Sequence, residues 1–218
     1  MSTMFAYEDP ERGMRVLNMA VPFASEGVAV AETWDAMGMR GTASHDVLLE
    51  DVFVPDERVL ADRPYGVVDG PLQVISSIGF SVISGVYLGI AEAARDHAIA
   101  AVRDASDPVA QRQVGLMTHR ARVAAWALDC ALAIVGDGPV PSLETLEAVM
   151  LAKREIALAG VEICDIAMEV AGGSGYFRGS PFERAYRDIR AAKFHPFTPE
   201  ATLMRAGRAA FGLDVEVP

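Results

Sequence analysis

The sequence is poor in cysteine and in positive charge, and each shortage excludes a class of protein. Two cysteines occur in 218 residues, Cys130 and Cys164. Both lie in apolar stretches without metal-type spacing, so we predict reduced thiols in a core rather than a disulfide framework or a metal site. The 19 basic and 30 acidic residues leave a formal net charge of -11. A chain of this charge repels nucleic acid and anionic membrane surfaces, so we expect neither as a partner.

Long apolar runs are also lacking. The most apolar stretch, residues 74–91, is interrupted by four serines and three glycines, so the sequence predicts no membrane-spanning helix. Residues 1–13 contain neither the basic nor the apolar region of a secretory signal. Together these features predict a cytoplasmic protein.

Alanine and other helix-forming residues are abundant, and hydrophobic residues make up 51% of the chain. Alanine favours helices and lets them approach closely. We therefore predict a mainly α protein, with an up-down four-helix bundle in residues 66–218. Proline and polar capping residues mark the expected helix starts. The expected helices span residues 71–105, 108–135, 142–171, 180–192 and 198–211.

The first 65 residues lack the helical pattern of the rest of the chain and predict a partial β-domain. Three short strands are expected, at residues 16–22, 27–33 and 47–55, since apolar or alternating runs there end at glycine or proline. Three strands are too few to close a sheet. The domain boundary is expected near residues 60–70, where proline and glycine cluster.

Three segments, in this order, resemble the acyl-CoA dehydrogenase family. Residues 34–44 (WDAMGMRGTAS) and 48–55 (LLEDVFVP) resemble its "G-x-R-x-S/T" loop and the "D-V-x-V-P" strand that follows. Residues 170–176 (VAGGSGY) resemble its "G-G-x-G-Y" turn, and residues 181–188 (PFERAYRD) resemble "P-x-E-R-x-x-R-D". We interpret Arg184, Arg187 and Asp188 in the last segment as an ion-pair lattice.

The resemblance implies a flavin enzyme of fatty acid metabolism. Such proteins have N-terminal helices, a middle β-domain and a C-terminal four-helix bundle, with FAD between the last two. They form homodimers or homotetramers through the bundle, and the neighbouring subunit contacts part of the FAD. The reaction dehydrogenates an acyl-CoA across its α,β bond, with a glutamate as base and the flavin as hydride acceptor.

Two parts of the family pattern have no match in the sequence. Nothing before Val16 resembles the N-terminal helices or the first strands of the β-domain, so we expect a fragment of a longer protein or a truncated chain that needs a second chain. The usual glutamate follows the Arg of "R-D" by nine residues, and here Pro196 stands at that place. The first bundle helix, the other place for the base, also lacks a carboxylate in residues 74–90.

His195 is the candidate catalytic residue in place of the glutamate. A branch of the same fold consists of monooxygenases supplied with reduced FMN or FAD by a reductase, and these carry a histidine near this position. Residues 40–47 (RGTASHDV) also fit that branch. Histidine titrates near neutral pH and can act as a base or a hydrogen-bond donor. The alternative is that His195 only caps the turn before Pro196.

The resemblance also assigns binding residues. Gly172, Gly173 and Gly175 are candidates for the flavin pyrophosphate, with a helix C-cap as the alternative role. Glu169 stands where the family often has glutamine. Thr198 is a candidate flavin contact or an N-cap. Arg40 and Ser44 are candidates for the substrate entrance, with a structural salt bridge as the alternative.

Three functions are therefore open. The sequence favours an acyl-CoA dehydrogenase-like flavoprotein without its usual glutamate. A reduced-flavin monooxygenase of the same fold gains from His195. A non-catalytic subunit that completes another chain's flavin site gains from the missing segments and from Glu169.

Overall fold

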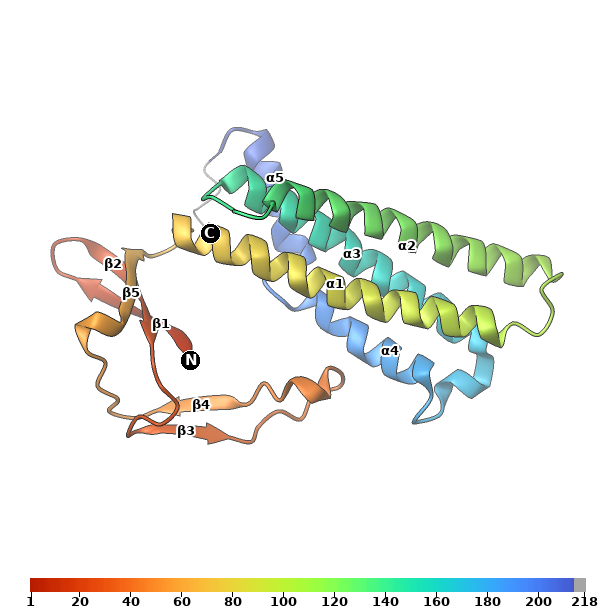
Figure 1. Cartoon of the computed structure of the whole chain (residues 1–218), viewed down its shortest axis with the longest axis horizontal. Helices are drawn as coiled ribbons and strands as arrows, with labels where there is room; N and C mark the ends of the chain where they lie inside the picture. Colours follow the sequence, from red (N-terminus) through yellow and green to blue (C-terminus); the bar gives the residue numbers. More distant parts are fainter. Residues whose placement is uncertain (214–218) are drawn as a thin grey trace. The chain divides into compact units, whose positions relative to one another are not determined.

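A computed structural model describes residues 1–213 of the chain. The chain divides into two compact units. The strand unit comprises Met1–Ala36 and Arg40–Asp69, and the helical unit comprises Gly70–Leu213 together with the three residues Met37–Met39. Figure 1 shows the elements of both units.

The strand unit contains two small antiparallel sheets. One consists of β1 (Ser2–Asp9), β2 (Gly13–Ala20) and β5 (Val59–Pro64), with β2 in the centre. The other pairs β3 (Val28–Ala31) with β4 (Asp46–Leu49). Sequence patterns predicted strands at β2, β3 and β4 but missed β1 and β5. The missed strands are mostly exposed and carry charged residues, and β5 ends in proline, so neither shows the apolar alternation of a half-buried strand.

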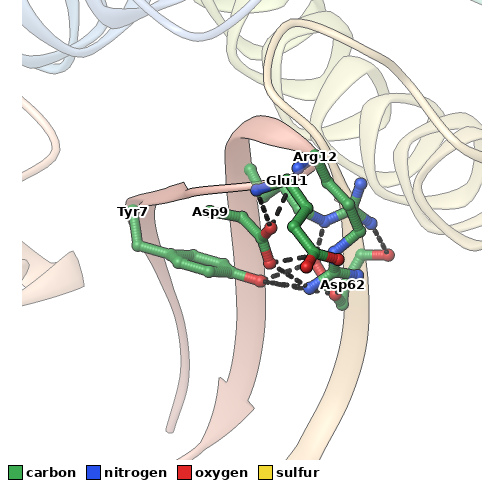
Figure 2. Close-up of polar contacts among 6 residues, drawn as sticks. Tyr7, Asp9, Glu11, Arg12 and Asp62 are labelled. Atoms are coloured by element: carbon green, nitrogen blue, oxygen red, sulfur yellow. Dashed lines mark hydrogen bonds and ion pairs between the residues drawn. The ribbon is translucent and has the colours of Figure 1, made fainter.

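A cluster of charged side chains ties the β1–β2 hairpin to β5 (Figure 2). Arg12 lies between two carboxylates, 2.6 Å from Asp9 and 2.8 Å from Asp62. Arg15 of β2 lies 2.7 Å from the same Asp62. The hydrogen bond from the Arg12 side chain lowers the pKa of Asp9 to about 2. The cluster connects β1 and β5, the two edge strands of this sheet. Both strands expose half or more of their side chains.

The helical unit is built from three long helices and two short ones, and in Figure 1 the long helices run alongside one another with α4. Their bounds are α1 (Gly70–Ala101), α2 (Pro108–Val135), α3 (Leu143–Ala171), α4 (Pro181–Ile189) and α5 (Pro199–Ala210). The expected starts of α2 and α3 are confirmed by their caps. Asp107 accepts a hydrogen bond from the Val109 amide, and Ser142 accepts one from the Thr145 amide, each 3.0 Å long. The predicted bundle fold is confirmed. The predicted end of α4 at residue 192 is wrong, because a 3-10 turn at Arg190–Lys193 follows Ile189.

Small residues let the helices pack closely in the core. Most of the buried alanines of α1, α2 and α3 lie in one cluster with Tyr87, Ile156 and Ile189. Gly160 marks a close approach between α3 and α4, because a Cβ built on it would lie 2.7 Å from Cδ1 of Ile189. Ile189 is completely buried. The close approach of α4 therefore depends on glycine at position 160.

Helix α1 is long and apolar enough to cross a membrane by length and composition, contrary to the expectation from its interrupted apolar run. Serine and glycine hardly lower its mean hydropathy. Ser77, Ser81 and Ser84 are buried and each donates to the carbonyl oxygen four residues earlier. Tyr87 and Leu88 of the same helix belong to the bundle core. Core helices of bundles share this composition, so the finding is weak evidence for a membrane segment.

The segment Met37–Met39 is held against α4 by backbone contacts. Asp188 accepts a 2.7 Å hydrogen bond from the Met39 amide, and Arg187 donates one of 2.7 Å to the Met37 carbonyl. A Cβ on Gly38 would lie 2.3 Å from the Arg187 carbonyl oxygen. Arg187 also pairs with Glu183 at 2.5 Å. The expected ion-pair lattice is confirmed for Arg187 alone, which pairs with Glu183, whereas Asp188 accepts from the backbone of a distant segment. An ion pair of Arg184 stays a prediction.

Replacing Gly160 with Ala is expected to destabilise the helical unit by about 1–3 kcal/mol, since the added methyl group overpacks Ile189. The matched control is Gly115→Ala on α2, where a Cβ meets nothing within 4 Å. That change should stabilise the chain by about 0.5–1 kcal/mol, because alanine is the better helix former. Urea unfolding of both variants measures the difference. Equal effects at the two positions would contradict the packing at Gly160.

Gly38→Ala should release the Met37–Met39 segment, because the clash is with backbone that no side-chain rotation relieves. The Met39 amide then exchanges with solvent faster by roughly tenfold or more, as expected for loss of its hydrogen bond. Hydrogen exchange read by NMR measures this. Gly41→Ala is the control, since its Cβ meets nothing within 4 Å. Unchanged Met39 protection in Gly38→Ala would contradict the described packing.

Candidate functional site

His195 lies in the short segment between the 3-10 turn and α5. Its Nδ1 atom forms a hydrogen bond with the hydroxyl of Tyr87, a residue of α1. Tyr87 is completely buried, whereas His195 is exposed. One nitrogen of the imidazole is therefore anchored in the bundle core while the ring stays accessible from outside. Sequence analysis selected His195 but did not find Tyr87.

A buried lysine holds the backbone around His195. Lys153 of α3 is 2% exposed, and its Nζ atom donates to the carbonyls of His195 and Phe197 at 3.1 and 2.9 Å. Nζ also lies 5.7 Å from the ring centroid of Phe80, and this ring meets that of Phe197 edge-on. Sequence analysis missed Lys153. Its position in the apolar stripe of α3, between Met150 and Ala157, is the signal that could have found it.

The surroundings of His195 favour its neutral form. Burial lowers the pKa of His195, and the positive charge of Lys153 lowers it further. Burial raises the pKa of the Tyr87 phenol to about 12. At neutral pH the pair therefore consists of an uncharged imidazole and an uncharged phenol. Such a pair carries no net charge and leaves one ring nitrogen free to form a hydrogen bond with a ligand.

Thr198 lies three residues after His195 and caps α5. Its hydroxyl oxygen accepts a 3.2 Å hydrogen bond from the Ala201 amide, and its carbonyl accepts one of 3.0 Å from the Thr202 hydroxyl. The helix-capping alternative is therefore what the structure describes for this residue. A flavin contact of Thr198 stays a prediction.

The glycine turn ends α3 at a different place in the bundle. Gly172 has a φ of 59° and caps the helix, and Gly175 is packed, since a Cβ there would lie 2.9 Å from Cβ of Ala171. Gly173 is exposed and open, with nothing within 4 Å of a built Cβ. Glu169, one turn earlier, accepts a 3.4 Å hydrogen bond from Gln113 of α2. The backbone of Gly172 and Gly173 is thus the accessible part of the turn.

An aromatic and basic pocket adjoins the glycine turn. Its volume is about 540 Å³. It is lined by Met168, Tyr176, Arg178, Glu183, Tyr186 and Arg187. The rings of Tyr176 and the neighbouring Phe177 are strongly exposed. Exposed rings, a guanidinium and open glycine backbone are groups that suit a planar, phosphate-bearing ligand such as a flavin nucleotide.

The predicted site residues therefore fall into separate groups. His195 and Thr198 lie with Lys153, whereas Glu169 and the three glycines lie at the C-terminal end of α3. Lys153 and Ala171 are separated by 18 positions on one helix, about 27 Å at the usual rise per residue. Within residues 1–213, the His195 group and the glycine turn therefore lie at different places along α3.

Arg40 and Ser44 lie in the strand unit, where both are exposed. Arg40 donates a 3.0 Å hydrogen bond to the Ala36 carbonyl, and the Ser44 hydroxyl lies 3.0 Å from that of Thr42. These are local loop contacts. The predicted role of Arg40 and Ser44 at a substrate entrance stays a prediction. No cluster of metal-ligating side chains occurs in residues 1–213.

Comparison with known proteins identifies relatives along most of the chain. The sequence is 30% identical to the protein named "Putative acyl-CoA dehydrogenase YdbM" of Bacillus subtilis (strain 168), over 85% of this chain and 50% of that protein. It is 29% identical to amino sugar nitrososynthase DnmZ of Streptomyces peucetius, over 87% and 50%. It is 28% identical to indole-3-acetate monooxygenase of Pseudomonas putida, over 84% and 51%. The chain spans about half the length of these relatives.

Solved structures share the fold. Methanesulfinate monooxygenase MsuC of Pseudomonas fluorescens matches with a TM-score of 0.83 and 22% identity, covering 100% of this chain and 60% of that one. FMN-bound TdsC of Paenibacillus sp. A11-2 matches with a TM-score of 0.83 and 20% identity, covering 99% and 61%. The family description "Acyl-CoA dehydrogenase, C-terminal domain" matches residues 81–210, which is more than half of the chain. The chain therefore belongs to the acyl-CoA dehydrogenase family, and it matches the C-terminal helical domain of that family.

Proposed function

We propose that the chain forms part of a flavin-dependent oxidoreductase of the monooxygenase branch of this family, with His195 as its proton-handling residue. The observation that carries the proposal is the environment of His195. The imidazole stands next to the place where the family resemblance puts the glutamate base, and within residues 1–213 its ring bonds to a phenol rather than to a carboxylate. The chemistry therefore differs from that of the usual dehydrogenase centre.

Some of the relatives support this proposal. Two of the three curated relatives named above are a nitrososynthase and a monooxygenase. Glu200, the nearest carboxylate in the sequence, is exposed on the first turn of α5. Removal of an α-proton from a thioester needs a base held within reach of it. Neither Glu200 nor any other described carboxylate is hydrogen-bonded into the His195 group.

We propose a flavin, FMN or FAD, as the cofactor. When bound and reduced, the flavin supplies the electrons for oxygen activation. The exposed backbone of Gly172 and Gly173 would approach its phosphate, and Tyr176 and Arg178 offer a ring face and a positive charge beside it. The pocket of about 540 Å³ lies within the usual range for ligand sites. Glu169 accepts a hydrogen bond from Gln113, a neutral amide, so a phosphate bound at the turn would have to lie away from the Glu169 side chain.

The same geometry supports a homo-oligomer. Lys153, which holds the His195 segment, lies about 27 Å along α3 from the glycine turn at the usual rise per residue, so a flavin that uses both would take them from two copies. The relatives have further segments that this chain does not match, and these would extend the flavin pocket. We propose that a longer form of the protein or a second chain provides them.

The second candidate function is dehydrogenation of an acyl-CoA with FAD. It is favoured by the 30% identity with YdbM, whose printed name is that of an acyl-CoA dehydrogenase. In that case a neutral His195 would take the α-proton in place of the glutamate. The two candidates differ in the direction of electron flow, which an experiment can separate.

The test uses the full chain titrated with FMN and FAD, and follows the visible absorbance of the flavin. For the monooxygenase we expect that acyl-CoA thioesters of several chain lengths leave the oxidised bound flavin unbleached, and that oxygen reoxidises the bound reduced flavin. His195→Gln should slow this reoxidation by about 100-fold, as for loss of a proton-handling group. His119→Gln on α2 is the control and should change nothing. Bleaching by an acyl-CoA would establish the dehydrogenase instead, and the absence of flavin binding would refute both for this chain.

A further inference from the structure

The hydrogen bond between α1 and the segment before α5 carries an inference about the protonation of His195. Resting on the proposed function, we infer that Tyr87 is a positioning residue that keeps His195 in the tautomer with its proton on Nε2. His195 then acts as a hydrogen-bond donor to an oxygen atom of the bound ligand, and not as a base. Neither the family resemblance nor the comparisons assign a role to Tyr87.

The phenol of Tyr87 has a single proton to donate. The Tyr87 hydroxyl is buried, and the partner that the structure gives it within residues 1–213 is Nδ1 of His195. A buried hydroxyl without an acceptor destabilises the folded state. The phenol avoids that cost by donating to Nδ1, which must then be the unprotonated nitrogen. In a neutral imidazole the proton consequently lies on Nε2, since the bond made by one nitrogen determines the state of the other.

The charged and titratable groups around the ring also favour a neutral imidazole without a proton on Nδ1. Tyr87 approaches from α1 and Lys153 from α3, and the Lys153 ammonium donates to the carbonyl of His195 itself. A second positive charge on the imidazole would lie close to this ammonium. Burial and the charge of Lys153 both lower the pKa of His195. Protonation at Nδ1 would also force the buried phenol to turn its hydrogen away from its acceptor.

The arrangement is the opposite of that in hydrolases that use histidine as a base. There a carboxylate accepts the Nδ1 proton, so that Nε2 has a free lone pair and the imidazolium is stabilised. Here a phenol donates to Nδ1, and the nearby charge is positive. The same ring therefore presents a hydrogen instead of a lone pair on the side away from Tyr87. This favours chemistry in which a ligand oxygen is held or protonated over removal of a carbon-bound proton.

The experiment reads the tautomer directly in the full chain without flavin. Long-range ¹H–¹⁵N NMR at pH 7.5 distinguishes a protonated from an unprotonated ring nitrogen. The four histidines are assigned by comparison with His195→Gln. We expect Nε2 of His195 to be the protonated nitrogen. A wild-type spectrum with the proton on Nδ1, or with equal populations of both tautomers, would overturn the inference without the need for any variant.

Tyr87→Phe tests the cause, because it removes the hydroxyl and keeps the ring in the core. We expect mixed tautomers and a pKa of His195 above that of the wild type, since the neutral form loses its hydrogen-bond donor. Tyr65→Phe, on the exposed Tyr65 of the strand unit, is the control and should leave the His195 signals unchanged. Identical titration of His195 in the wild type and Tyr87→Phe would contradict a positioning role.

These outcomes are separate from those of the flavin titration. If the chain binds no flavin, the proposed function fails, yet the tautomer of His195 is still measured. If flavin binds and the proton lies on Nδ1, the function stands and the role of Tyr87 is wrong.

Discussion

The two hydrogen bonds from the Lys153 ammonium organise the part of the helical unit that carries His195. An ammonium group in an apolar core is costly unless its charge is compensated. The carbonyls of His195 and Phe197 supply that compensation by turning toward α3. The segment between the 3-10 turn and α5 therefore has a fixed course over the bundle. The direction of the His195 ring, the hydrogen bond to Tyr87 and the start of α5 at Thr198 all follow from that course.

The bundle itself provides the setting for this interaction through small residues. Buried alanines along α1, α2 and α3 keep the helices close, so that a long side chain from α3 reaches backbone atoms that follow α4. Gly160 of α3 has the same role, because its lack of a side chain leaves room for Ile189 of α4. The glycine turn at the end of α3 lies apart from this region. In the proposed function, the two regions would be half-sites that an oligomer brings together.

Sequence patterns predicted the helical part well, because capping and proline signals are local. Asp107, Ser142 and Thr198 each marked a helix start that the structure confirms. The edge strands β1 and β5 could not be found in this way. Their stability comes from pairing with β2 and from the charges around Asp62, which no short stretch of sequence reveals.

The candidate site could likewise be predicted from the sequence only in part. His195 was found by counting from Arg187, but its partners are 108 and 42 positions away in the sequence. Tyr87 and Lys153 are polar residues at positions where helical periodicity expects apolar ones. The periodicity therefore places both side chains toward the core. Periodicity does not indicate which polar group across the bundle each one meets. That information depends on the packing of α1, α3 and the segment before α5.

The measurement that tests this account most directly is amide hydrogen exchange in Lys153→Met, which keeps the length of the side chain and removes its charge. The amides of Ala201 and Thr202, bonded to the Thr198 side chain and carbonyl, report on the segment. Both should exchange faster by roughly tenfold or more, while the Gly136 amide at the end of α2 keeps its protection. Unchanged exchange at Ala201 and Thr202 would contradict the central role of Lys153.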